Sequence, residues 1–268
     1  MTEKDKLRWE RLDNAALIFP ASHRKSWSNV FRISFTMKDP IDPDILQEAV
    51  NHLAPRFPTI CARLCKSSFW YYLEEVKSPP AVMQDSYQPV RYMSKKEFST
   101  CAVRILYYKN RLAAEFFHAL TDGTGGMTFT KNLAAEYIRL RYGISIPFTD
   151  DIKDLNTPVP EEELKDDFKS FKGPIAAPRD DLHVYRPKGN LEPDRFLHDT
   201  LGIVDSKALV AEAKKYQVTV TAYLTALLIE CLLEMQAEDV PNRRKRKDPS
   251  CPLIPVISAF FILFTPFN

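Results

Sequence analysis

The clearest pattern in the sequence is an alternation of apolar and polar residues between positions 27 and 37. Residues two apart lie on the same face of an extended strand, so an alternating segment buries one face and exposes the other. One face would hold Trp27, Asn29, Phe31, Ile33, Phe35 and Met37, and the other would hold Ser28, Arg32, Ser34 and Thr36. The alternation predicts a half-buried strand.

Other segments alternate in the same way or repeat at the spacing of a helix. Asp42 is suited to cap a helix and Pro43 to begin one. The patterns predict helices over 8–19, 42–54, 126–141, from Ser206 onward and over 220–236, and strands over 60–65, 69–76, 101–108, 112–117 and 195–204. We expect the strands at 26–37, 69–76, 101–108 and 112–117 to form one largely antiparallel sheet, covered by the helices at 42–54 and 126–141.

Changes in composition divide the chain into four parts. Residues 1–143 carry most of the periodic segments, and residues 144–193 read as a proline-rich, acidic crossover or linker. Residues 194–247 resume the helical pattern and end in the basic run 243–247, which we interpret as a solvated helix exit, with a nuclear signal or a lipid contact as alternatives.

Residues 248–268 form an anomalous apolar tail. From Pro249 onward the tail has no charged residue and four prolines. We expect it to be a frameshifted or truncated end, to pack poorly and to allow self-association. A membrane anchor is disfavoured, because about a dozen apolar residues interrupted by Pro255 are too few to span a bilayer, and no other stretch reaches the required length.

Composition narrows the class of protein. With 45% apolar and 12% aromatic residues, the 268-residue chain can bury a core, and its formal charge of +2 gives no reason to expect a nucleic-acid partner. Five cysteines do not suggest a disulfide framework, and the charged N-terminus does not resemble a signal peptide. These features indicate a cytoplasmic globular protein with free thiols.

The candidate chemistry lies in the segment His118-Ala119-Leu120-Thr121-Asp122-Gly123-Thr124-Gly125-Gly126. By strand alternation, His118 follows Phe116 on the apolar face and sits at a strand end. Imidazole suits general-base work near neutral pH, and Asp122 could order the loop. A purely structural histidine remains the alternative. A phosphate loop is disfavoured because no Lys-Ser or Lys-Thr follows the glycines, and a metal site because no third ligand is near.

The pattern His-x-x-x-Asp-Gly between an apolar strand and a helix resembles the hallmark of the chloramphenicol-acetyltransferase-like superfamily. This group includes alcohol acetyltransferases and the condensation domains of nonribosomal peptide synthesis. Supporting likeness comes from the segment 41–50 with Arg56-Phe57-Pro58 after it, and from 218–227. The resemblance covers about residues 8–240. It implies an α/β fold, a two-layer sandwich with a largely antiparallel mixed sheet, whose second lobe is incomplete here.

The resemblance also implies a function. His118 would act as general base on an alcohol or amine acceptor. The acceptor would attack an acyl thioester of coenzyme A or phosphopantetheine, a co-substrate that is not permanently bound. The resemblance implies no metal. Asp122 would orient the loop through an ion pair, and Gly123 would keep the tunnel clear. The Asp-Phe-Gly-type motif of the family's second lobe is absent from the sequence. Two hypotheses therefore stay open: an acyltransferase, inactive if truncated, and a non-catalytic binding or regulatory protein.

Overall fold

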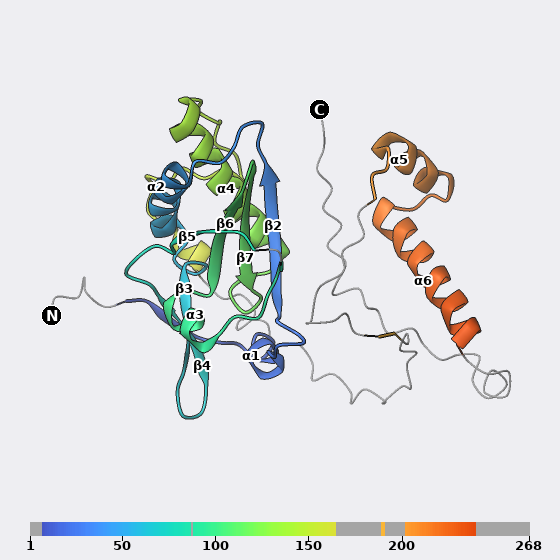
Figure 1. Cartoon of the computed structure of the whole chain (residues 1–268), viewed down its shortest axis with the longest axis horizontal. Coiled ribbons are helices and arrows are strands. Elements are labelled where there is room, and N and C mark those ends of the chain that lie inside the picture. The colour runs from blue at the N-terminus through green and yellow to red at the C-terminus, as the bar shows by residue number, and fades with distance from the viewer. Residues whose placement is uncertain (1–6, 87, 165–188, 191–201, 240–268) are drawn as a thin grey trace. The chain divides into compact units, whose positions relative to one another are not determined.

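The computed structural model describes residues 7–86, 88–164, 189–190 and 202–239 (Figure 1). The chain divides into two compact units, residues 1–172 and 173–268, and each is described by itself.

A four-stranded sheet in the order β2-β7-β6-β5 forms the centre of the first unit (Figure 1). β2 (Val30–Thr36) and β6 (Val103–Tyr108) both pair antiparallel with β7 (Arg111–Phe117), and β5 (Val82–Gln84) pairs parallel with β6. The predicted strand at 27–37 and the predicted hairpin are thereby confirmed. β7 is the strand that has a neighbour along its whole length on both sides.

Two helices, α2 (Pro43–Leu53) and α4 (Gly123–Tyr142), cover the apolar face of this sheet and pack on each other. α2 begins as the sequence predicts, because the Asp42 carboxylate accepts hydrogen bonds from the backbone N–H groups of Asp44 and Ile45. α4 ends at Gly143, whose φ of 68° places it in the left-handed region that glycine adopts freely.

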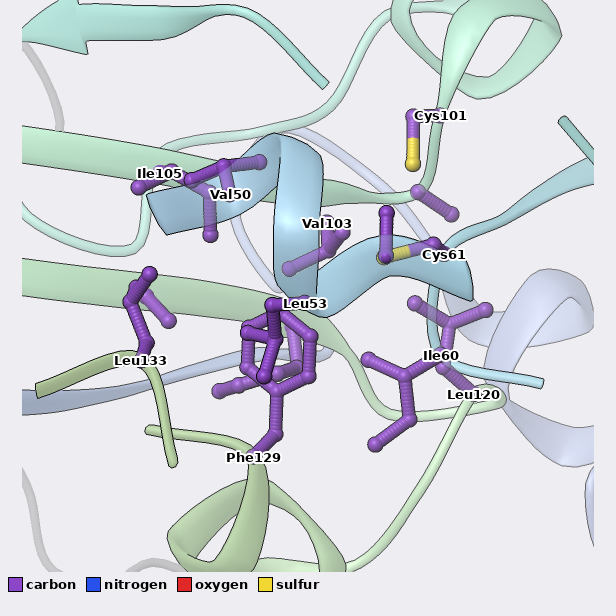
Figure 2. Packing of buried hydrophobic residues seen from close by; sticks show 14 of the residues in the cluster. Val50, Leu53, Ile60, Cys61, Cys101, Val103, Ile105, Leu120, Phe129 and Leu133 are labelled. Carbon is purple, nitrogen blue, oxygen red and sulfur yellow. The ribbon is translucent and has the colours of Figure 1, made fainter. Parts of the chain in front are cut away.

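The core between helices and sheet is almost entirely aliphatic and aromatic. Figure 2 shows side chains of α2, α4 and β6 meeting there. Those labelled from these three elements are Val50, Leu53, Phe129, Leu133, Val103 and Ile105, and all are at most 2% exposed. Cys61 and Cys101 border the same cluster, and burial raises the pKa of the Cys101 thiol to about 11, so that it resists ionisation.

The expectation of a helix over 8–19 was wrong. Residues Trp9–Arg11 form β1, and only Ile18–Ser22 (α1) is helical. Pro20 lies within the first turn of α1, where its missing N–H has no intrahelical partner to lose. The short β1 is fixed by pairing with a distant strand, which local spacing of apolar residues does not reveal.

The expectation of a single sheet was also wrong. β3 (Ala62–Lys66) and β4 (Tyr71–Glu75) form a hairpin, and β1 pairs antiparallel with β4 to make a separate three-stranded sheet in the order β1-β4-β3. The predicted strand at 69–76 exists, but it belongs to this smaller sheet.

Besides the short strand β5, three short helical elements were not predicted. They are the 3₁₀ helices η2 (Ala54–Arg56) and η3 (Glu161–Leu164), and the helix α3 (Lys95–Thr100). α3 is begun by a capping box, in which the Ser94 hydroxyl accepts from the Glu97 N–H and the Glu97 carboxylate accepts from the Ser94 N–H.

The first part of the proline-rich segment is attached to the first unit. The buried amide of Asn132 on α4 donates to the Asp151 carbonyl at 2.6 Å and accepts from the Lys153 N–H at 2.7 Å. The buried guanidinium of Arg56 donates to both carboxylate oxygens of Glu163, at 2.6 and 3.1 Å. Residues 149–163 thus follow the surface of α4 and η2.

The second unit contributes two helices to the described residues, α5 (Ser206–Lys215) and α6 (Val220–Asp239). Asp205 caps α5, and its carboxylate accepts from the Ala208 N–H. By length and composition alone, residues 220–238 could cross a membrane, with a mean hydropathy of 1.4. The sequence reading that no stretch reaches this length is corrected accordingly.

The basic run 243–247, the tail 248–268 and most of the predicted strand 195–204 lie outside the described residues.

The sheet's second face carries buried charge, centred on Glu115 of β7. The Glu115 carboxylate, 1% exposed, accepts from Arg32 on β2 at 2.6 Å and from Arg104 on β6 at 2.8 Å, and also from the Val90 N–H at 2.6 Å. Arg32 also donates to both carboxylate oxygens of Asp85, at 2.7 and 2.8 Å. Burial would raise the pKa of Asp85, but hydrogen bonds and charge from Arg32 and Arg111 hold it below its ordinary value.

We predict that Glu115→Gln destabilises the first unit by about 1–3 kcal/mol, because Arg32 and Arg104 lose the charge that they share and keep only Asp85 and Glu97 as partners. Urea unfolding followed by circular dichroism measures the change. Asp151→Asn is the matched control, since Asp151 pairs with Lys131 at an exposed site and should change the midpoint little. Equal midpoints for Glu115→Gln and wild type would contradict the role given to this charge cluster.

Candidate functional site

His118 is the first residue after β7, and its backbone continues the pairing with β2. Its N–H donates to the Asn29 carbonyl at 2.9 Å, so the residue is fixed at the end of this inner strand. The half-buried imidazole stacks on Phe19 of α1, with ring centroids 4.5 Å apart and planes 11° apart. Phe31 of β2 meets the same imidazole at a ring-centroid distance of 5.1 Å and an interplanar angle of 61°. Two aromatic rings therefore set the orientation of the imidazole.

The ring nitrogens distinguish His118 from the other described histidines. His23 has both ring nitrogens on backbone carbonyls, those of Ser28 at 2.6 Å and Met93 at 2.8 Å. His52 has its Nδ1 on the Glu136 carboxylate at 2.7 Å. Within the described part of the chain, no hydrogen bond engages either ring nitrogen of His118. A half-buried imidazole with free nitrogens is able to exchange a proton with a bound molecule.

Asp122 caps the helix that follows the histidine loop. It is exposed and occupies the N-cap of α4, where its Oδ1 accepts from the Gly125 N–H at 2.8 Å. Among the residues that the structure describes, no cation pairs with it. The Asp122 cap satisfies a free N–H of the first helical turn and fixes the start of α4, and the expected ion pair stays a prediction.

The glycines after His118 allow α4 to begin close to the sheet. Gly123 is the first residue of α4. A Cβ on Gly126 would come within 2.8 Å of Phe31 Cε2 and 3.2 Å of Ile33 Cδ1, closer than ordinary contacts. Because Phe31 also contacts the His118 ring, a side chain at 126 would disturb the ring that orients the imidazole.

A cavity of about 260 Å³ is lined in part by the histidine loop. Ala119 and Leu120 contribute to its wall, whereas His118 does not. The rest of the wall comes from β1 and the residues after it, and from β3, β4 and η3. The charged residues that line the cavity are Arg8, Glu10, Arg11, Asp13, Glu75 and Glu163.

Sequence reasoning located His118, Asp122 and Gly123 but missed the aromatic residues around the imidazole. Phe31 was assigned to the correct face, and alternation alone could have paired it with His118 at the end of a neighbouring strand. Phe19 could not be found in this way, because it belongs to a helix whose limits the sequence misplaced. In the described ranges, no group of three His, Cys, Asp or Glu residues is arranged to hold a metal ion.

We predict that Asp122→Ala destabilises the first unit by about 0.5–2 kcal/mol, whereas Asp122→Asn changes stability little, because asparagine caps a helix about as well as aspartate. Thermal unfolding of the two variants makes the comparison. Equal losses in both variants would instead indicate that the charge of Asp122 matters, as an ion pair requires.

Comparison with known proteins identifies the fold of this chain but not its family. No protein-family model and no curated protein matches the chain. The condensation domain of the Monacolin K polyketide synthase MokA superposes with a TM-score of 0.51 at 13% identity, over 85% of this chain and 60% of that one.

Two further solved structures match smaller parts. The polyketide synthase associated protein 5 from Mycobacterium tuberculosis gives a TM-score of 0.37 at 18% identity, over 52% of this chain and 35% of its own. The first condensation domain of the calcium-dependent antibiotic synthetase gives a TM-score of 0.40 at 15% identity, over 53% of this chain and 40% of its own. This chain spans less than two thirds of the length of each of these structures. The likeness to the MokA domain confirms the expected fold class: a mixed α/β fold of the condensation-domain type.

Proposed function

We propose that this chain functions in acyl transfer from a thioester of coenzyme A or phosphopantetheine to a small alcohol or amine, with His118 as the general base. The observation that carries the proposal is the imidazole of His118, half-buried at the end of β7 between two aromatic rings, with both nitrogens free of hydrogen bonds in the described residues. The condensation-type fold supports the reaction class.

The proposed reaction needs one proton acceptor at a fixed position. A free ring nitrogen of His118 would take the proton of the acceptor's O–H or N–H as that atom attacks the thioester carbonyl. The tetrahedral intermediate then collapses, the carbon–sulfur bond breaks, and the thiolate leaves with the proton that His118 had taken, which restores the neutral imidazole. Stacking on Phe19 would hold the imidazole in one orientation through these steps. The apolar surroundings would limit competing hydrolysis by excluding water.

The second candidate function is binding or regulation without catalysis. It is favoured by the lining of the 260 Å³ cavity, to which His118 does not contribute, since a catalytic base must reach the bound substrate. In this case the loop from His118 to Gly126 would serve to hold α4 on the sheet, through the cap at Asp122 and the close approach at Gly126.

We predict that His118→Ala lowers the rate of thioester consumption by about two to four orders of magnitude, the usual contribution of a general base. Release of thiol from acetyl-coenzyme A, with a short-chain alcohol or amine present, measures the rate. His52→Gln is the matched control, because His52 is a partly exposed histidine on α2 that already binds Glu136.

Each outcome of this assay decides between the two functions. A loss in His118→Ala with retained activity in His52→Gln supports the proposed base. Turnover that survives His118→Ala would refute the assignment of His118. If the wild-type chain consumes no thioester above the protein-free rate but binds the thioester, the non-catalytic function is the correct one.

A further inference from the structure

Asn29 lies at the junction between α1 and the central sheet, directly before the first residue of β2. Its backbone is left-handed, with a φ of 50°. Asparagine adopts this conformation more readily than most residues other than glycine. The side chain is half-buried, and a polar group in such a place needs hydrogen-bond partners.

The side-chain amide of Asn29 holds the end of α1. Its Nδ2 donates to the Phe19 carbonyl at 2.9 Å and to the Ser22 hydroxyl oxygen at 3.0 Å. The last carbonyls of a helix have no partner within the helix, so the amide supplies one. All five residues of α1 are half-buried or exposed, and a helix this short is not stable by itself. The position of α1 therefore depends on these two hydrogen bonds.

The backbone of Asn29 holds His118. The Asn29 carbonyl accepts from the His118 N–H at 2.9 Å, one position beyond the Val30–Phe117 pair of β2 and β7. Asn29 thus bonds through its backbone to the residue that carries the imidazole. Through its side chain it bonds to Phe19, whose ring stacks on that imidazole.

We propose that Asn29 is a positioning residue for His118, which keeps the Phe19 ring stacked on the imidazole. This inference rests on the proposed function of His118 as a base. The two rings are 4.5 Å apart and 11° from parallel, an arrangement that lasts only while α1 stays in place. Without the Asn29 amide, α1 would be free to shift, the imidazole would turn about its side-chain bonds, and its nitrogens would lose their fixed direction. A base without a fixed direction contributes less to catalysis.

The substitution Asn29→Asp tests this role. A carboxylate has nearly the shape of the amide and tolerates the same backbone conformation, but it cannot donate to the Phe19 carbonyl. The backbone carbonyl that accepts from His118 is retained. Asn29→Gly is a second variant, because glycine adopts the positive φ freely and has no amide. Asn110→Asp is the matched control, since the Asn110 amide donates to the Met37 carbonyl at 2.9 Å, next to the other end of β2.

Two properties of the full chain are measured. The first is the set of His118 ring signals in nuclear magnetic resonance without substrate, for which Phe19→Leu gives the position without the stacked ring. The second is the kinetics of thiol release from acetyl-coenzyme A. We expect both Asn29 variants to move the His118 signals toward the Phe19→Leu position and to lower kcat about tenfold with KM unchanged. Asn110→Asp should match wild type in both, and circular dichroism verifies that each variant is folded.

Three results would overturn the proposal. The first is His118 signals that stay in place in a folded Asn29 variant. The second is an equal shift in Asn110→Asp, which would indicate a general effect of weakening β2. The third is a kcat that stays at the wild-type value although the signals move. A wild-type chain without turnover would instead refute the proposed function, and this failure is distinct because the ring signals are recorded without substrate.

Discussion

The central strand β7 has two faces with opposite requirements, and the first unit depends on satisfying both. Its apolar face, with Phe116 in the core, is closed by α2 and α4. Its other face carries the buried carboxylate of Glu115, which would be costly without a counter-charge. Arg32 and Arg104 reach this carboxylate from the strands on either side. The same ion pairs therefore neutralise the buried charge and join three strands.

The position of His118 follows from this arrangement. The residue continues β7 by one position, so any shift of that strand relative to β2 would move the imidazole away from Phe19 and Phe31. Beyond the loop, the Asp122 cap and the close approach of Gly126 to Phe31 fix the start of α4 against the same strand. Strand pairing, aromatic contacts and helix packing thus hold the candidate base together. A catalytic group must be held in a fixed orientation to contribute to catalysis in this way.

Much of this could be predicted from local sequence, and the parts that failed share a physical cause. Alternation revealed β2 and the hairpin of β6 and β7, and Asp42 with Pro43 marked the start of α2, because each signal lies within a few residues. Arg32 was interpreted as a solvated residue, since alternation separates two faces without showing that both are covered. The pairing of Arg56 with Glu163 joins residues more than a hundred positions apart. Likewise, β1 has three residues, too few for any period, and exists because β4 pairs with it.

The proposed function requires contact between the His118 imidazole and a bound acyl-thioester, and nuclear magnetic resonance of the histidine rings measures that contact. The chain has five histidines, and His118→Gln assigns the signals of interest. A thioether analogue of acetyl-coenzyme A, which cannot be consumed, would be titrated into the labelled protein. The account predicts that the His118 ring signals shift on binding while those of His23 and His52, already hydrogen-bonded within the fold, stay in place. Binding of the analogue that leaves the His118 signals unmoved would contradict the account.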